Sequence, residues 1–278
     1  MTNALIRIAD ALDRLAPPPP VPAPQGAPAY RWAAGVLQAI DGFAPVPLDL
    51  LTGIDGQKAT LLANGRRHAA GHGAHDALLW GARGMGKSAL VKSTIAAIQA
   101  QGADLRLVEA SGDELQGLAG LFELLTADAR PTIVFIDDLG FETGGDSARH
   151  LRSVLDGGAM ARPAHIRLYV TSNRRHILPR DMAEQDSAIN PRDVVDDRLA
   201  LADRFGLSLG FHACDQDTWL AMVTAYAACL GVDFDQQDAL TWATQRGARS
   251  GRMAWHYATE LAGRAGKAGV LGSVASGS

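Results

Sequence analysis

The sequence predicts an α/β fold: a three-layer αβα sandwich around a parallel sheet of about five strands, followed by a small all-α domain. Three observations predict it. Short apolar runs alternate with helical patterns between residues 77 and 211, a glycine-rich turn follows the first of these runs, and no strand-like run follows Asp215. Of the 278 residues, 47% are hydrophobic and 20% are charged, which leaves enough apolar side chains for a large core.

The beginning of the chain predicts a short amphipathic helix over residues 1–16. Leu5, Ile8, Leu12 and Leu15 recur at helical spacing, with charged residues on the other face. Consecutive prolines from Pro17 then open a Pro/Ala-rich stretch, so residues 17–29 are predicted to be an extended linker. The helix could pack on its own chain, on a neighbouring subunit or on a partner.

Residues 30–212 are predicted to form the α/β domain. Residues 30–40 show helical spacing, and a loop over residues 48–56 leads into a helix over residues 57–70. Apolar and β-branched runs predict strands at residues 77–80, 105–109, 132–136, 166–171 and 207–211. Helices are predicted between the strands at residues 88–99, 118–126 and 147–155. This alternation is typical of a parallel sheet covered on both faces.

Residues 213–264 are predicted to form the small helical domain. Its helices are expected at residues 218–230, 237–246 and 251–264. We interpret the aromatic residues Trp242, Trp255 and Tyr257 as its core. Residues 265–278 are rich in Gly, Ser and Ala and are expected to form a flexible tail.

The segment from Gly81 to Ser88 matches the pattern G-x-x-x-x-G-K-[ST] of a phosphate-binding loop (P-loop) at every fixed position. Glycines allow the backbone to wrap closely around a polyphosphate and to aim several N–H donors at it. Lys87 would bring a positive charge to the β- and γ-phosphates, Ser88 would be a ligand of Mg²⁺, and the following helix adds its positive N-terminal end. We therefore expect ATP and Mg²⁺ as cofactors, bound by Gly81, Ala82, Arg83, Gly84, Met85, Gly86, Lys87, Ser88 and Ala89.

Two carboxylates directly follow the apolar run that ends at Ile136. A buried strand would carry Asp137 to the sheet edge beside the phosphates, where it can hold Mg²⁺. Asp138 would then orient the attacking water or accept its proton. Many ATPases carry Glu at this second position, so the shorter Asp138 leaves the rate of hydrolysis open. Glu142 is a second candidate for the base.

Together with these two motifs, four further segments make the chain resemble the AAA+ ATPases over most of residues 48–263. They are residues 50–55, Thr171-Ser172-Asn173, Asp203-Arg204-Phe205-Gly206 and residues 247–252. Within this class the chain looks most like a family of bacterial ATP-binding proteins labelled as a domain of unknown function, through residues 78–88, 135–139, 171–176 and 203–210. It resembles helicase loaders, transposition helper ATPases and replication initiators more distantly.

The resemblance implies roles in nucleotide binding for three residues of the α/β domain. Leu51 and Ile54 would be apolar walls of the adenine pocket, although their segment also fits an ordinary turn. Asn173 would be the polar sensor that hydrogen-bonds the γ-phosphate or the lytic water, the alternative being a helix cap.

The resemblance also implies roles for arginines. Arg204 would reach the γ-phosphate bound by a neighbouring subunit, because a guanidinium stays charged and offers several donors in one plane. Arg198 is the alternative for this role, and a surface ion pair is the alternative for Arg204. The small helical domain would be a lid in which Arg252, or else Arg249, contacts phosphate. A solvated helix face would also explain Arg252.

Other residue groups give weaker signals. We interpret His68, His72 and His75 as surface histidines rather than metal ligands, because glycines interrupt the helix and no carboxylate or cysteine completes the set. Cys214 and Cys229 lack the spacing of a metal site and are expected to be reduced thiols.

The charge of the chain bears on its partners. A net charge of −4 argues against a protein that binds nucleic acid through its overall charge. The local basic run Arg174-Arg175-His176 with Arg180 could still contact a nucleic-acid backbone, a neighbour's phosphate or solvent. Neither a long apolar run nor a signal peptide is recognisable, so we expect a cytoplasmic protein without a membrane span.

Together, the motifs predict an ATP-binding AAA+ protein that hydrolyses ATP to drive a conformational change on a partner macromolecule, either a protein or a nucleic acid. A homo-oligomeric ring in which Arg204 acts in trans would fit the resemblance. Two alternatives stay open: an ATP-controlled adaptor that hydrolyses little, and a small-molecule kinase built on the same loop.

Overall fold

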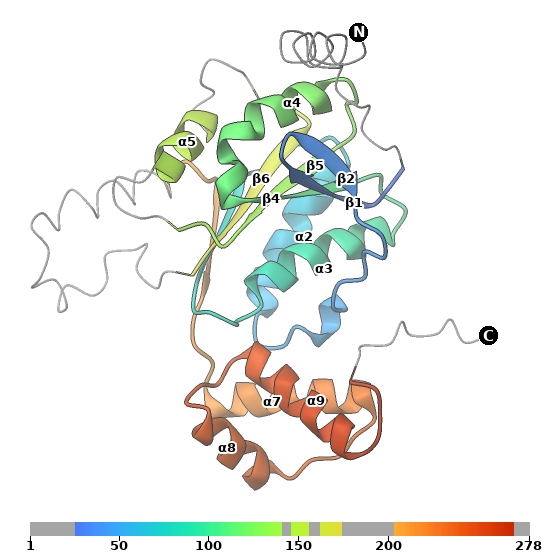
Figure 1. The fold of residues 1–278 in the computed structure, drawn as a ribbon, viewed down its shortest axis with the longest axis vertical. Coiled ribbons are helices and arrows are strands. Elements are labelled where there is room, and N and C mark those ends of the chain that lie inside the picture. The colour runs from blue at the N-terminus through green and yellow to red at the C-terminus, as the bar shows by residue number, and fades with distance from the viewer. Residues whose placement is uncertain (1–25, 141–145, 156–161, 174–202, 270–278) are drawn as a thin grey trace, which may run out of the picture.

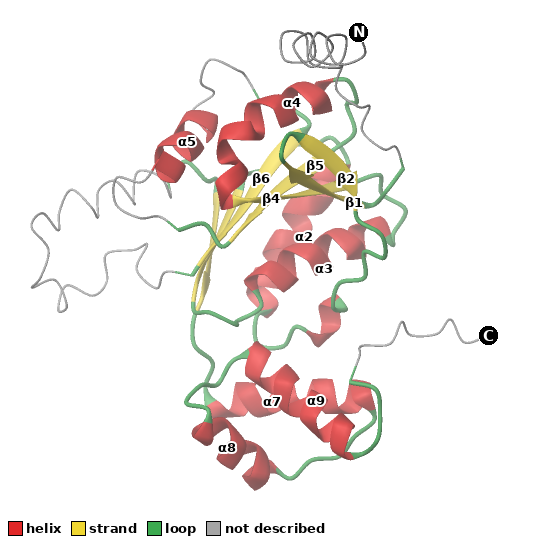
Figure 2. Ribbon diagram, in the orientation of Figure 1, coloured by secondary structure: helices red, strands yellow, loops and turns green. Residues whose placement is uncertain are grey.

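The structure is a computed structural model, and it describes residues 26–140, 146–155, 162–173 and 203–269. The helix predicted over residues 1–16 and most of the predicted linker lie outside these ranges. Within them, the chain forms a sheet with helices on both faces and a helical domain beyond one edge of that sheet (Figures 1 and 2).

The sheet has seven strands in the order β2-β1-β4-β5-β6-β3-β7. All neighbouring strands are parallel except β1 and β2. This confirms the predicted α/β class, with two more strands than the roughly five expected. The strands are β1 Ala29–Ala33, β2 Val36–Ala39, β3 Ala77–Gly81, β4 Arg106–Ser111, β5 Thr132–Asp137, β6 Ile166–Ser172 and β7 Leu207–Phe211.

The two additional strands form a hairpin where the sequence predicted a helix over residues 30–40, and that prediction is wrong. Ala34 and Gly35 join the strands with φ angles of 50° and 77°. Positive φ at both central residues is typical of a type I′ turn, whose twist matches that of paired strands. Because β1 also pairs with β4, the hairpin extends the sheet on the side away from β7.

Helices cover both faces of the sheet and bury two hydrophobic clusters (Figure 1). One face is covered by α2 and α3, whose Leu61 and Leu90 pack in the same cluster as Leu79 and Phe135 of the sheet. The other is covered by α4 and α5, whose cluster includes Leu121 and Leu151. The bounds are α2 Asp55–Ala69, α3 Lys87–Gln99, α4 Leu118–Thr126 and α5 Asp146–Leu155, with short 3₁₀ turns η1 Leu48–Leu50 and η2 Gly112–Gly117.

Three helices follow β7 and form the compact domain predicted there: α7 Gln216–Leu230, α8 Gln236–Gln245 and α9 Gly251–Arg264. Asp215, Asp235 and Ser250 cap their N-termini, each accepting a backbone N–H three residues ahead. Tyr257 packs against the ring of Trp242 at a centroid distance of 5.3 Å. The apolar residues of this lid continue into the cluster beneath α2 and α3, so the lid is packed onto the α/β domain.

His68 is buried, so its interpretation as a surface residue is wrong. Its Nε2 donates to the Thr132 carbonyl at 3.1 Å, and burial lowers its pKa to about 4. His72 and His75 are exposed. In the described part of the chain, no group of three or more His, Cys, Asp or Glu side chains could hold a metal ion by itself. None of the helices described there is long and apolar enough to cross a bilayer.

The strand order places several polar residues at one edge of the sheet. β3 leads into the P-loop, β5 ends at Asp137, and β6 lies between these two strands. Residues that follow β6 therefore stand between the P-loop and the Asp137-Asp138 pair, as expected at the carboxyl edge of an open α/β sheet.

Candidate nucleotide-binding site

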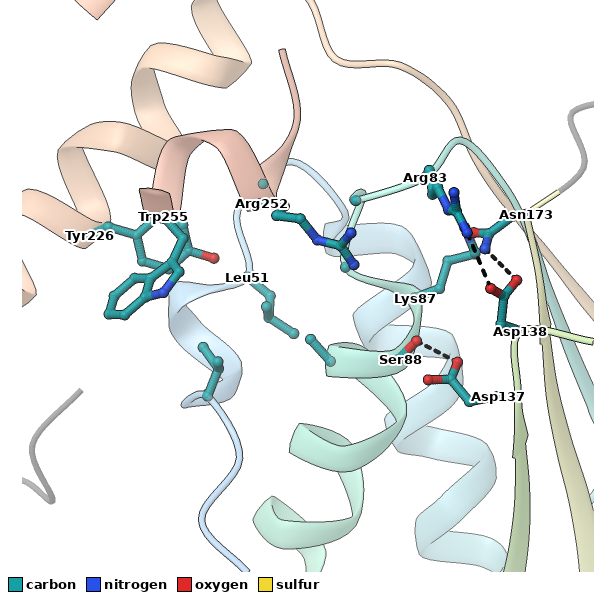
Figure 3. Close-up of a pocket in the computed structure, with 15 residues that line it drawn as sticks. Leu51, Arg83, Lys87, Ser88, Asp137, Asp138, Asn173, Tyr226, Arg252 and Trp255 are labelled. Atoms are coloured by element: carbon teal, nitrogen blue, oxygen red, sulfur yellow. Dashed lines mark hydrogen bonds and ion pairs between the residues drawn. The ribbon is translucent and has the colours of Figure 1, made fainter. Parts of the chain in front are cut away.

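A cavity of about 350 Å³ lies between this edge of the sheet and the lid (Figure 3). Polar side chains gather at one end, and Leu51, Tyr226 and Trp255 lie toward the other (Figure 3). The lining residues are Val46, Leu51, Arg83, Gly84, Gly86, Lys87, Ser88, Ala89, Asp137, Asp138, Asn173, Tyr226, Gly251, Arg252 and Trp255.

The P-loop is fixed at its start by a close approach to β7. Gly81 has a φ of 124°, and a Cβ at this position would lie 2.0 Å from the carbonyl oxygen of Phe211. The next residue, Ala82, donates its N–H to that same oxygen at 2.8 Å. Only glycine allows this contact, so the fold itself requires the first glycine of the motif.

Lys87 opens α3 and points into the loop. Its Nζ donates to the carbonyls of Gly81 and Ala82 at 3.0 and 2.9 Å and to Asn173 Oδ1 at 2.9 Å. The residue is only 5% exposed. Burial lowers its pKa to about 8, against the opposing influence of Asp138 and Asp137. The cation is thus held among oxygen acceptors at the centre of the loop.

Ser88 and Asp137 meet across the gap between α3 and β5. The Ser88 hydroxyl donates to Asp137 Oδ1 at 2.6 Å, and the Thr171 hydroxyl donates to the same oxygen at 2.5 Å. One hydroxyl and one exposed carboxylate suit Mg²⁺, which takes few protein ligands and completes its shell with phosphate and water oxygens. These residues therefore fit the expected ion.

Asp138 lies beside Asp137 and has a backbone φ of 53°, which is unusual for a residue with a side chain. Asn173 Nδ2 donates to Asp138 Oδ1, and the Arg83 guanidinium lies 3.5 Å from Asp138 Oδ2. Asn173 therefore bridges Lys87 and Asp138 through the two ends of its amide (Figure 3). The structure thus brings the loop lysine, the second acid and the predicted sensor into one hydrogen-bonded chain.

The lid contacts the P-loop directly through the first turn of α9. The Arg252 N–H donates to the Gly84 carbonyl at 3.1 Å, and the Arg252 side chain lines the cavity. A Cβ on Gly84 would lie 2.9 Å from the hydroxyl of Ser250, the cap of α9. Arg249, the alternative to Arg252, is exposed, and its carbonyl accepts from Cys214.

Some of the predicted residues lie away from the cavity. Ile54 is buried behind the loop near Gly86 and does not line the cavity, whereas Leu51 does. Arg204 is exposed, just before β7, and is not a lining residue. Glu142, Arg198 and the basic run from Arg174 to Arg180 lie outside the described residues.

Val46, Tyr226, Gly251 and Trp255 line the cavity and Thr171 bonds to Asp137, but the sequence analysis gave none of these five residues a role of its own in the site. Trp255 was interpreted as core, but it is partly exposed, lines the cavity and packs edge-on against Tyr226 at 5.4 Å. Its position three residues after Arg252 places both on one helix face, which was an available signal. Thr171 lies in β6, two residues before Asn173, which directly follows that strand.

Comparisons with known proteins bear on the fold and the family of the chain. No curated protein matches the chain. Among solved structures, it is similar to the Thermotoga maritima RuvB Holliday junction branch migration motor, with a TM-score of 0.52, 15% identity, and coverage of 81% of this chain and 68% of RuvB. It is also similar to the Aeropyrum pernix ORC1 protein in complex with DNA, with a TM-score of 0.51, 11% identity, and coverage of 81% and 66%. At such identities the likeness shows a shared fold.

The family assignment comes from the sequence. A family model described as "Protein of unknown function (DUF815)" matches residues 25–265, which includes every element that lines the cavity. The chain therefore belongs to the DUF815 family, and its fold is that of the AAA+ ATPases.

Proposed function

We propose that this protein binds ATP with Mg²⁺ and hydrolyses it to drive a conformational change on a partner macromolecule. One observation carries the proposal: Lys87 and Ser88 of the P-loop face Asp137 and Asp138 within a single cavity, and Asn173 connects the lysine to the second acid. This set of side chains matches the requirements of phosphoryl transfer to water, in which positioning and charge neutralisation supply most of the catalysis.

Each part of the cavity suits one part of the nucleotide. Leu51, Val46, Tyr226 and Trp255 offer apolar and aromatic surface to the base. The P-loop amides and Lys87 would hold the β- and γ-phosphates, and Arg252 would approach them from the lid. Ser88 and Asp137 would hold Mg²⁺, which when bound neutralises charge on the phosphates.

The residues around Asp138 would orient and activate the attacking water. Its carboxylate would accept a proton from the attacking water or orient it, and the amide of Asn173 would fix both that carboxylate and the lysine. The lid would exclude solvent, because α9 already contacts the P-loop at Gly84. A change at the phosphates would then be transmitted to the lid through this contact.

The ATP-controlled adaptor remains a second candidate, and one observation favours it. Both oxygens of Asp138 have partners: Asn173 donates to Oδ1 and the Arg83 guanidinium lies 3.5 Å from Oδ2. A carboxylate engaged by two donors in this way is less accessible to an attacking water until a partner or a neighbouring subunit moves Arg83. Phosphate release measured with and without candidate partners separates the two functions.

The partners belong to the proposal as well. We infer a cytoplasmic homo-oligomer in which Arg204 of one subunit reaches the nucleotide of the next. The client is a protein or a nucleic acid. The similarity in fold to a branch migration motor and to a protein in complex with DNA supports the nucleic-acid class.

The test uses two variants. Lys87→Ala is expected to weaken ATP binding by more than about 100-fold, because the loop loses its cation. Lys92→Ala is the matched control: it lies on the same helix but pairs with Glu109 at 2.8 Å, and ATP affinity should stay unchanged. Equilibrium binding of a fluorescent ATP analogue measures both. Unaltered affinity of the Lys87→Ala variant would refute nucleotide binding at this loop.

Asp138→Asn tests the chemical step. ATP affinity should remain within about threefold, whereas turnover should fall by about 100-fold or more, the usual contribution of a general base. Phosphate release under saturating ATP measures turnover. Equal turnover of the variant and the parent would exclude Asp138 as the base.

A further inference from the structure

The turn that carries both acids depends on one residue that the proposed mechanism does not use. Thr171 lies at the end of β6, and only 1% of it is exposed. Its hydroxyl donates to Asp137 Oδ1 at 2.5 Å and accepts the N–H of Asp138 at 2.8 Å. Its carbonyl accepts the N–H of Leu139 at 2.8 Å. Three consecutive residues of the turn are therefore bonded to Thr171.

This arrangement arises where the regular ladder ends. Between β5 and β6 the last paired residues are Ile136 and Val170, so Asp137 and Thr171 are the first residues beyond the pairing of these two strands, although Asp137 still pairs with Ser111 of β4 and Thr171 with Leu79 of β3. Asp138 then adopts a left-handed backbone conformation, with a φ of 53°. Such a conformation persists only where the surroundings fix it. The Thr171 side chain provides the hydrogen bond that a partner strand would otherwise give to the Asp138 N–H.

We propose that Thr171 is a positioning residue that orients both acids: Asp137 through its side chain and Asp138 through its backbone. Ser88 also donates to Asp137 Oδ1, but under the proposed function Ser88 becomes a ligand of the metal. Thr171 is buried behind the acids, and its hydroxyl continues to fix Asp137. Residues that hold a metal ligand in this way typically affect metal affinity or activity by about 10- to 100-fold.

The hydroxyl can be tested separately from the volume of the side chain. Thr171→Val removes the hydroxyl and keeps the shape, whereas Thr171→Ser keeps the hydroxyl and removes a methyl group. Thr94→Val is the matched control, because Thr94 is also a buried threonine but its hydroxyl has no hydrogen-bond partner in the described part of the structure.

Amide hydrogen exchange of the nucleotide-free protein gives the first readout, which does not depend on ATP. Exchange at residues 137–139 should be at least about tenfold faster in Thr171→Val than in the parent, because the Asp138 N–H loses its acceptor. Thr171→Ser and Thr94→Val should match the parent. Unchanged exchange in Thr171→Val would overturn the proposal, as would equally fast exchange in both Thr171 variants.

Metal affinity and kinetics give the second readout, which rests on the proposed function. Mn²⁺ binding to the nucleotide complex, followed by electron paramagnetic resonance, should weaken about tenfold or more in Thr171→Val, and kcat should fall about 10- to 100-fold with KM for ATP within about threefold. Thr171→Ser should restore both. A parent protein that binds no nucleotide would refute the proposed function, while hydrogen exchange would still decide the role of Thr171. Parent-like Mn²⁺ affinity in Thr171→Val would overturn the proposal.

Discussion

Individual side chains in this site depend on one another through short polar contacts. Lys87, Asn173 and Asp138 form one chain of hydrogen bonds, and Asp137 receives hydroxyls from two different elements. In such a network the loss of one member leaves another polar group without its partner, so single substitutions have effects beyond the residue that is changed.

The lowered pKa of Lys87, about 8, predicts a pH dependence of ATP binding. The protonated lysine attracts the phosphates, and the bound phosphates in turn raise its pKa. The affinity for ATP should therefore fall as pH rises through the pKa that Lys87 has in the ATP-free protein. Between about pH 7 and pH 9.5 the protonated fraction of the free protein falls about 30-fold, which sets the maximum loss of affinity. Binding titrations across this range measure it.

Lys87→Arg supplies the control for that measurement. A guanidinium stays protonated throughout the range, so the affinity of this variant, even if weaker, should be independent of pH. Parallel pH profiles of the parent and the variant would show that a group other than Lys87 is responsible.

Burial of His68 predicts a pH dependence of stability. Its pKa in the folded protein is about 4, below the ordinary 6.5, so the unfolded chain binds a proton first as the solution becomes acidic. The contribution of His68 to stability is present above about pH 6.5 and is lost as pH falls toward about 4, with a loss of about 2 kcal/mol by about pH 5.

Urea unfolding at several pH values measures this loss. The difference in free energy of unfolding between the parent and His68→Gln should shrink by about 2 kcal/mol from about pH 7.5 to pH 5. His72→Gln, at an exposed position of the same region, is the control and should give a constant difference. If the difference in free energy of unfolding also stayed constant for His68→Gln, the lowered pKa of His68 would be contradicted.

At the level of elements, the sequence predicts most of the α/β domain, because each strand from β3 to β7 is built around a few apolar or β-branched residues. The β1–β2 hairpin could not be predicted in this way. Its turn is Ala34-Gly35, which lacks the Asn-Gly or Asp-Gly signal of a type I′ turn, and the apolar residues around it also fit a helix. The hairpin becomes favourable only when β1 pairs with β4, a contact distant in sequence.

The parts of the site that consist of consecutive residues could be predicted from the sequence. The P-loop and the Asp137-Asp138 pair are continuous motifs, so the sequence alone identifies them. Tyr226 and Trp255 reach the cavity only because the lid packs against the loop before α2. That packing depends on side chains far apart in the chain, which a reading of local patterns does not detect.

The contact between the lid and the loop before α2 predicts the effect of a glycine substitution. Gly53 has a φ of 78°, and a Cβ there would lie 2.4 Å from Cγ2 of Thr218 on α7. Gly71 has a similar φ of 72° with nothing within 4 Å of its Cβ position. Gly71→Ala should therefore cost about 1 kcal/mol of backbone strain, and Gly53→Ala about 1–3 kcal/mol more from the clash.

Thermal or urea unfolding compares these variants, and a second substitution identifies the cause. Thr218→Ser removes the clashing methyl group and keeps the hydroxyl, so Gly53→Ala combined with Thr218→Ser should recover most of the additional loss. An equal loss of stability in Gly53→Ala and Gly71→Ala would show that Thr218 of the lid does not pack closely against Gly53.

For the whole molecule, the proposed ring predicts that two inactive variants complement each other. Arg204 is exposed beside β7, the strand that pairs with β3 and the P-loop. If it acts in trans, a Lys87→Ala subunit can supply its arginine to the nucleotide of an Arg204→Ala subunit. A mixture of the two should then hydrolyse ATP at a rate several-fold above either variant alone.

Phosphate release and mass in solution together check this prediction. Mass should increase with a non-hydrolysable ATP analogue, and Arg66→Ala, at another exposed arginine that contacts Gln101, should keep full activity. A monomer in both conditions, or a mixture no more active than its components, would instead favour the adaptor.

The unequal burial of the tryptophans gives the molecule an intrinsic optical reporter. All five lie in the described part of the chain, and Trp32, Trp80, Trp219 and Trp242 are each less than a tenth exposed. Trp255 is the partly exposed one and borders the cavity beside Tyr226. Because indole emission shifts to longer wavelength in water, the long-wavelength part of the tryptophan fluorescence should come mainly from this ring. Quenching or a blue shift of the Trp255 emission would report the binding of a ligand in the cavity in real time, without an attached dye.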